Sequence, residues 1–158
     1  MIQTTNLSFK YNKSSSSVFE DLNIKLEKGG IYGLLGENGV GKTTFLRLLS
    51  GLLFPKQGTI EVNGFTPGKR ETAFLKQIYY FPETLEIIDK SIVKYAEMYR
   101  PFYPKFNKGY FDYYISEFGV NPKVYVNTLS QGNRKKALLA FALACDTDIL
   151  LLDEPTNG

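Results

Sequence analysis

The stretch that decides the fold is Gly36-Glu37-Asn38-Gly39-Val40-Gly41-Lys42-Thr43. Its spacing fits the pattern G-x-x-x-x-G-K-[ST], in which a glycine-rich loop joins a strand to a helix. The apolar run at residues 31–35 predicts a buried strand before the loop, and the apolar spacing of residues 44–53 predicts a helix after it. Glycines permit close backbone approach to a ligand, and a helix N-terminus adds partial positive charge. The stretch therefore predicts a phosphate-binding loop.

The side chains of this loop suit a nucleotide with a bound metal ion. Lys42 supplies a point charge for the β- and γ-phosphates, and the Thr43 hydroxyl can complete the oxygen shell of Mg²⁺. The candidate nucleotide-binding residues of this region are Asn38, Gly39, Gly41, Lys42, Thr43 and Thr44.

Two further motifs follow in a fixed order. Leu129-Ser130-Gln131-Gly132 precedes a helix expected over residues 133–144, with Ser130 as its N-cap. The aliphatic run at residues 149–152 ends in Asp153 and Glu154, as expected where a buried parallel strand presents one acid to a metal and the next to a water. With these three motifs, essentially the whole chain resembles the ATP-binding subunit of an ABC transporter, of the bacterial exporter-like branch.

The resemblance implies hydrolysis of Mg²⁺-ATP by an in-line water. Lys42 and the loop amides would hold the phosphates, while Thr43 and Asp153 would organise Mg²⁺. Glu154 would position or deprotonate the water. Glu83 stands where the family usually has the glutamine of its glutamine loop, which makes it both a catalytic and a metal-binding candidate.

The resemblance also implies three contacts outside the phosphate loop. Tyr11 matches the aromatic residue that stacks on adenine, although a tyrosine at a strand end is more often simple packing. Ser130 and Gly132 would meet the γ-phosphate bound by an opposite protomer, so a dimer with an identical or related cassette is expected. Gln131 departs from the usual glycine of that signature.

The expected fold is α/β, with a P-loop NTPase (RecA-like) core, a small antiparallel β layer and a helical subdomain. Residues 1–83 and 129–158 would form the core, and residues 84–128 the helical subdomain. Alternating side chains predict half-buried strands at residues 2–10, 22–27 and 58–63, and a core strand at 74–81 after a short helical turn. Residues 14–17 are expected to be an exposed connection. Cys145, the only cysteine, is expected to be a core thiol.

The aromatic residues of the segment 84–128 predict two or three short helices packed through their rings, interrupted by Pro101 and Pro104. The residue types name no partner for it. The resemblance places its first part against membrane subunits.

Composition limits the other function classes. The net charge is +3 and the basic residues are scattered, so no nucleic-acid surface is indicated. No apolar run approaches the roughly 20 residues that span a bilayer. We expect a soluble, cytoplasmic chain, held at the inner face of the membrane by an integral membrane permease subunit.

Three functions remain open at this stage. The favoured one is the motor subunit of a bacterial exporter, and the others are a soluble ABC ATPase and a nucleotide-binding fragment without efficient hydrolysis. The chain stops at Pro155-Thr156-Asn157-Gly158, where the family continues into a D-loop, another core strand and a switch histidine, and it contains no histidine. On the resemblance, the C-terminal core strands would be missing and hydrolysis by this chain alone would be weak.

Overall fold

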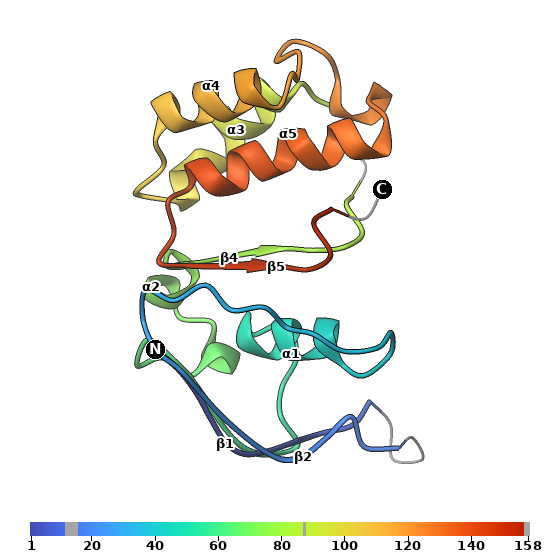
Figure 1. Cartoon of the computed structure of the whole chain (residues 1–158). Coiled ribbons are helices and arrows are strands. Elements are labelled where there is room, and N and C mark those ends of the chain that lie inside the picture. The colour runs from blue at the N-terminus through green and yellow to red at the C-terminus, as the bar shows by residue number, and fades with distance from the viewer. Residues whose placement is uncertain (12–15, 87, 157–158) are drawn as a thin grey trace. The chain divides into compact units, whose positions relative to one another are not determined.

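The computed structural model describes residues 1–11, 16–86 and 88–156, and the chain forms two compact units, Met1–Leu75 and Lys76–Gly158 (Figure 1). The first unit contains β1 (Ile2–Phe9), β2 (Phe19–Leu26), α1 (Lys42–Leu49), β3 (Gln57–Val62), the 3₁₀-helix η1 (Pro67–Lys69) and α2 (Thr72–Leu75). The second contains β4 (Ile78–Phe81), α3 (Ile92–Tyr99), η2 (Arg100–Phe102), α4 (Lys108–Glu117), η3 (Val126–Thr128), α5 (Gln131–Ala144) and β5 (Ile149–Leu152).

The antiparallel layer predicted from alternating side chains is confirmed. β1 lies between β2 and β3, and Ile2 pairs with Leu26 on one side and with Val62 on the other. Each strand lies within three residues of its predicted limits. Of the predicted connection at residues 14–17, residues 14 and 15 lie outside the described part of the chain, whereas Ser16 and Ser17 are exposed.

The helix after the glycine-rich loop begins and ends earlier than predicted. α1 starts at Lys42, directly after Gly41, and buries Phe45 and Leu48. Gly51 adopts a left-handed φ of 71°, and a Cβ there would lie 2.3 Å from the carbonyl oxygen of Pro67. The chain therefore turns at Gly51 and cannot continue the helix to residue 53.

The prediction of a strand at residues 31–35 is wrong. These residues form no strand, and the exposed fractions of Ile31 and Leu35 are 104% and 93%. A strand exists only where a neighbour satisfies its backbone groups, and none of the described strands pairs with this segment. The apolar run thus indicated a preference for burial, but the described chain supplies no partner for it.

In the second unit, a parallel pair of strands carries a helical layer. β4 and β5 pair from Ile78 with Ile149 to Phe81 with Leu152. Figure 1 shows α3, α4 and α5 on one side of this pair. The strand predicted at residues 74–81 is present only from Ile78, because Phe74 belongs to α2, where its side chain is buried. A backbone turn therefore separates the predicted helical turn from the strand.

Four aromatic residues, one in β4 and three between β4 and α5, pack around Phe141 of α5. The rings of Tyr79, Tyr95, Tyr103 and Phe106 have centroids 5.1–6.1 Å from that of Phe141. The helices α3, η2, α4 and η3 all lie within residues 84–128, so the predicted helical packing is confirmed. The division into a core and a separate helical subdomain stays a prediction.

Cys145, at the end of α5, is 1% exposed, as expected for a core thiol. Burial raises the pKa of this thiol to about 12. Among the described residues, no helix combines the length and apolar character needed to cross a bilayer.

Candidate functional site

The glycine-rich loop has the backbone geometry that its sequence predicts. Gly39 and Gly41 have φ values of 85° and 104°, in the left-handed region that favours glycine. A Cβ on Gly41 would lie 2.6 Å from Cγ1 of Val18, whereas a Cβ on Gly39 would meet nothing within 4 Å. The loop is therefore packed against the unit at Gly41 and open at Gly39. An open glycine before a helix N-terminus is where a phosphate can approach the backbone closely.

Lys42 begins α1, and its side chain folds back over the loop. Its Nζ donates to the carbonyl oxygens of Gly36, at 2.7 Å, and of Glu37, at 3.0 Å. The ammonium group is thereby held beside the exposed residues 36–40. An ammonium in this position can transfer its donors from neutral carbonyls to a charged phosphate, with which it forms stronger bonds.

Tyr11 lies next to the second threonine of α1. Its hydroxyl is 2.8 Å from Oγ1 of Thr44, which is 5% exposed. Its ring meets Phe9 edge to face at a centroid distance of 5.1 Å, and the residue is 49% exposed. The structure thus places a half-exposed aromatic ring beside the helix that follows the loop. Thr43, the predicted metal ligand, is partly buried in the first turn of the same helix.

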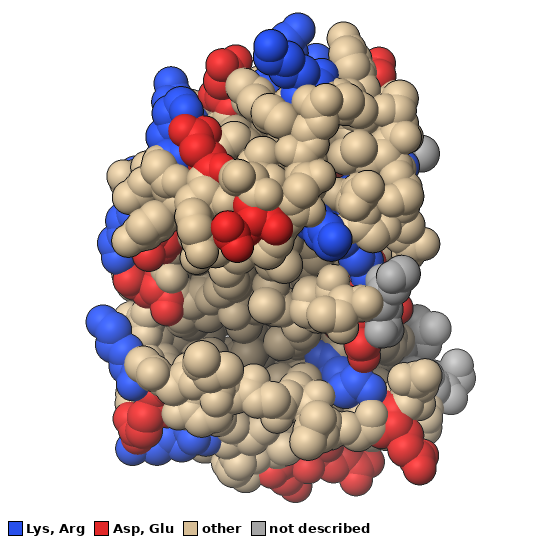
Figure 2. Space-filling view, turned by 45° about the horizontal axis from the view of Figure 1, so that its top comes forward, with Lys and Arg blue, Asp and Glu red and all other residues tan. Residues whose placement is uncertain are grey.

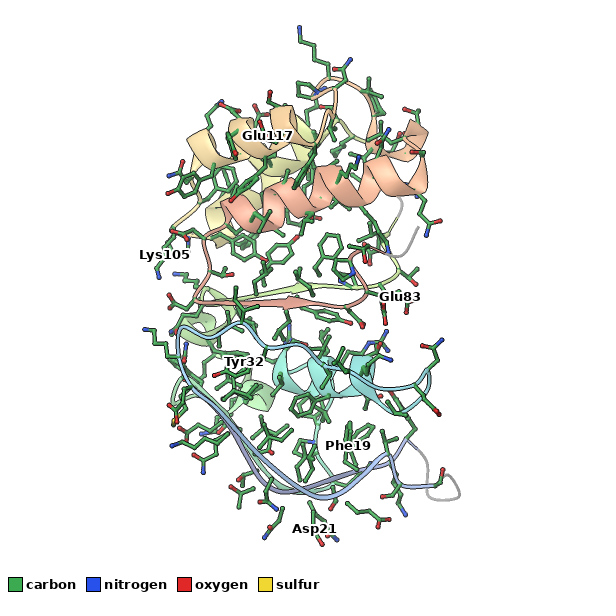
Figure 3. All side chains as sticks on the ribbon, viewed as in Figure 1. Phe19, Asp21, Tyr32, Glu83, Lys105 and Glu117 are labelled. Atoms are coloured by element: carbon green, nitrogen blue, oxygen red, sulfur yellow. The ribbon has the colours of Figure 1, made fainter. Side chains whose placement is uncertain are left out.

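The predicted acidic residues of the second unit gather at one edge of the parallel pair. Because Phe81 pairs with Leu152, β4 and β5 end together, and Glu83 and Asp153 both follow this edge. Glu83 is exposed and Asp153 is 3% exposed. Figure 3 shows Glu83 where the ribbons of β4 and β5 both end. The carboxyl end of parallel strands is where ligands bind in α/β sheets.

Asp153 is anchored through both its backbone and its side chain. Its N–H donates to the carbonyl oxygen of Phe81 at 2.9 Å, and the Tyr80 hydroxyl donates to its Oδ2 at 3.0 Å. The sequence carries no local signal for this role of Tyr80, because its partner is 73 residues away, on the other strand. The anchors fix the direction in which this carboxylate points.

Glu154 follows in a turn with left-handed backbone. Its φ is 47°, which is uncommon for a residue with a side chain. Its carbonyl oxygen accepts a hydrogen bond of 2.9 Å from Nζ of Lys135 on α5. Lys135 is 5% exposed, and its role was likewise not predicted from the sequence. A possible signal was its position three residues before buried Leu138, on the apolar side of the helix.

The start of α5 confirms the predicted N-cap. The Ser130 hydroxyl accepts from the backbone N–H of Asn133 at 3.3 Å, and the helix begins at Gln131, two residues before the predicted start. A Cβ on Gly132 would meet nothing within 4 Å. Arg134 steadies this end by donating to the carbonyls of Val126, Asn127 and Leu129. The helix N-terminus is therefore capped by Ser130 and held by the hydrogen bonds of Arg134. It is open on the side of Gly132.

The predicted site residues belong to both units. Tyr11, Thr44 and the phosphate loop with Lys42 and Thr43 lie in the first unit, where Tyr11 and Lys42 make the contacts above. The second unit brings Glu83, Asp153 and Glu154 to one sheet edge and holds Ser130 and Gly132 at the start of α5.

The oxygen donors at these positions fit Mg²⁺. A threonine hydroxyl and carboxylates are hard ligands, and proteins usually hold Mg²⁺ with one or two carboxylates together with substrate phosphates. Within the described residues, no three side chains of His, Cys, Asp or Glu are grouped to hold a metal.

Figure 2 shows both basic and acidic side chains on one face of the molecule. On the face shown in Figure 2, neither sign forms a continuous patch. This distribution agrees with the modest net charge of +3.

Comparisons with known proteins agree with these motifs. The ABC transporter family matches residues 19–157. The ATP-binding proteins YtrB and NatA of Bacillus subtilis are both 35% identical, over 90% and 100% of this chain. The chain spans 49% of YtrB and 68% of NatA, so it corresponds to part of such a protein.

A solved structure agrees with the same assignment. An ABC transporter ATP-binding protein from Pyrococcus furiosus is 30% identical, with a TM-score of 0.81 over 98% of this chain and 75% of that one. The fold is thus the α/β P-loop NTPase fold of ABC ATPases. The chain belongs to the ABC transporter family.

Proposed function

We propose that this chain binds Mg²⁺-ATP at the loop 36–43 and takes part in its hydrolysis, as the ATP-binding subunit of a bacterial ABC transporter. The main support for this proposal is the conformation of the loop. Gly39 is open and left-handed, Gly41 is packed and left-handed, and Lys42 lies over the loop with its ammonium bound only to neutral carbonyls in the contacts described. Family membership supports it independently.

The chemistry is assigned to this chain's own groups. Lys42 and the loop N–H groups bind the phosphate oxygens, and the half-exposed ring of Tyr11 stacks on adenine. Thr43, Asp153 and Glu83 are the residues that would hold Mg²⁺, which neutralises charge on the phosphates when bound. Glu154 accepts a proton from the attacking water or orients it.

A second ATP-binding subunit completes the proposed site. Ser130 and Gly132 lie at an open helix N-terminus, which suits a γ-phosphate held by another cassette. The relatives are transporter components, so we also propose an integral membrane permease as a partner, with this chain on the cytoplasmic side of the membrane. No nucleic-acid partner is proposed.

Hydrolysis is tested with Glu154→Gln, and Glu117→Gln on the exposed side of α4 is the matched control. We expect Glu154→Gln to slow steady-state hydrolysis by roughly two to four orders of magnitude, because a positioned general base contributes about that much. ATP binding by the same variant should persist, since Glu154 acts on the water. The control should match the unsubstituted chain.

Three results would contradict parts of this proposal. Equal hydrolysis by Glu154→Gln and the unsubstituted chain would remove Glu154 from the mechanism. ATP binding with no hydrolysis by the unsubstituted chain, alone or with a second cassette, would favour a nucleotide-binding role. Co-purification with ribosomes and not with a membrane subunit would favour a soluble ABC ATPase.

A further inference from the structure

We propose that Lys135 is a positioning residue that holds the turn carrying Glu154, and so sets where the Glu154 carboxylate can reach. This inference rests on the proposed function, in which Glu154 handles the attacking water. Lys135 touches neither ATP nor water in the proposal, and acts through its contact with the backbone of Glu154.

The burial of Lys135 is the first observation. Its side chain is 5% exposed, while the neighbouring Lys136 is exposed. Lysine is almost never fully buried without a partner, because removing an ammonium from water is costly. The bond from Nζ of Lys135 to the carbonyl oxygen of Glu154, at 2.9 Å, recovers part of that cost. A buried lysine that carries this cost and contacts the Glu154 carbonyl is consistent with a role in positioning that turn.

The conformation of the turn is the second observation. Glu154 has a φ of 47°, in the left-handed region that a residue with a Cβ seldom adopts. Such a backbone persists where its surroundings determine it. Asp153 on one side is held by Phe81 and Tyr80, and the carbonyl of Glu154 on the other side is held by Lys135. The Glu154 side chain therefore leaves a backbone that is fixed at both ends.

The position of Lys135 on α5 gives the contact a wider consequence. Lys135 lies five residues after Ser130, which caps the same helix. At 1.5 Å per residue the two are roughly 7.5 Å apart along the helix axis. A rigid helix thus joins the end proposed to meet one ATP to the turn that carries the base for another. Displacement of the capped end would be transmitted to Glu154 through Lys135.

The test compares Lys135→Met, Lys135→Arg and the exposed neighbour Lys136→Met in the whole chain. Methionine keeps the length and apolar stem but cannot donate, and arginine restores a donor. We expect Lys135→Met to lower kcat for ATP about a hundredfold with KM unchanged, because a small misplacement of a catalytic group costs about that much. Lys135→Arg should recover part of kcat, and Lys136→Met should match the unsubstituted chain.

Hydrogen exchange provides a readout that does not depend on activity. The amides of Asp153, Glu154 and Thr156 should exchange faster in Lys135→Met than in Lys136→Met, while those of β5 stay protected. If Lys135→Met does not fold, Lys135→Gln, whose amide is too short to reach the carbonyl, takes its place under the same criteria.

Unchanged exchange of the amides of Asp153, Glu154 and Thr156 together with unchanged kcat would overturn the positioning role. A lower melting temperature with kcat unchanged would also overturn it, since that result describes a merely structural lysine. Absence of hydrolysis by the unsubstituted chain is a different failure. It would overturn the proposed function and the catalytic part of this inference, while the exchange experiment would still decide whether Lys135 holds the turn.

Discussion

At the scale of single residues, the phosphate loop depends on backbone conformations that only glycine adopts easily. Gly41 combines a φ of 104° with close packing against Val18 and Phe19. Gly132, at the start of α5, has open space around it. Replacing glycine by alanine should therefore lower stability at Gly41 and raise it at Gly132.

Gly41→Ala should destabilise the first unit and abolish ATP binding, because its Cβ would lie 2.6 Å from Cγ1 of Val18 in a strained backbone. Gly132→Ala should stabilise α5 by about 0.5–1 kcal/mol, since alanine is the better helix former. Thermal unfolding of both variants checks this pair. Equal melting temperatures for the two would contradict the account of the loop.

Tyr11 allows the hydroxyl and the ring to be tested separately. Tyr11→Phe removes only the hydrogen bond to Thr44 and should cost about 1 kcal/mol of stability with ATP affinity nearly unchanged. Tyr11→Ala also removes the stacking surface and should weaken ATP binding by about 1–3 kcal/mol. Calorimetric titration of both variants measures the difference. Equal ATP affinity in the two variants would show that the ring does not contact the base.

At the scale of elements, the segment 31–35 is the clearest departure from the sequence prediction. Its apolar side chains indicate a core strand, yet the structure leaves Ile31 and Leu35 exposed without a neighbouring strand among the described residues. Exposed apolar segments of high β-propensity favour association between chains. The segment should therefore govern how this chain behaves at high concentration.

The double substitution of Ile31 and Leu35 by serine should reduce self-association and leave the melting temperature nearly unchanged, because neither side chain is buried. Leu48→Ser, in the buried face of α1, is the contrast and should unfold the first unit. Sedimentation velocity over a range of concentrations measures association. A large loss of stability in the double variant would show that residues 31–35 are buried in solution.

The end of α5 gives a second test at this scale. Burial raises the pKa of the Cys145 thiol from 9.0 to about 12, so the folded chain keeps a proton that the unfolded chain loses above about pH 9. The contribution of this protonated thiol to the free energy of unfolding is fully present below pH 9. It decreases as the pH rises from 9 toward 12. In Cys145→Ala, the melting temperature should fall less steeply between pH 9 and 12 than it does in the unsubstituted chain. An equally steep decline in the variant would assign it to other groups, such as the buried Tyr79, whose pKa burial also raises.

At the scale of the whole molecule, the sequence predicted what local patterns can specify. Ser130 caps α5, and the aliphatic run before Asp153 is a strand, because N-caps and apolar runs act over a few residues. The contacts of Tyr80 with Asp153 and of Lys135 with Glu154 were not predicted, since they join residues 73 and 19 positions apart. The prediction of a strand at residues 31–35 was wrong for the same reason, because a strand forms only where another strand, distant in the sequence, pairs with it.

The measurement that tests the central claim most directly is calorimetric titration of the whole chain with Mg²⁺-ATP, with Lys42→Ala as the control. We predict binding by the unsubstituted chain, stabilisation of about 2.7 kcal/mol at 100 times Kd, and loss of binding in a folded Lys42→Ala variant. Equal binding by the two proteins would place the nucleotide away from the loop 36–43. No binding by the unsubstituted chain would contradict the claim that this loop, as folded here, is a phosphate site.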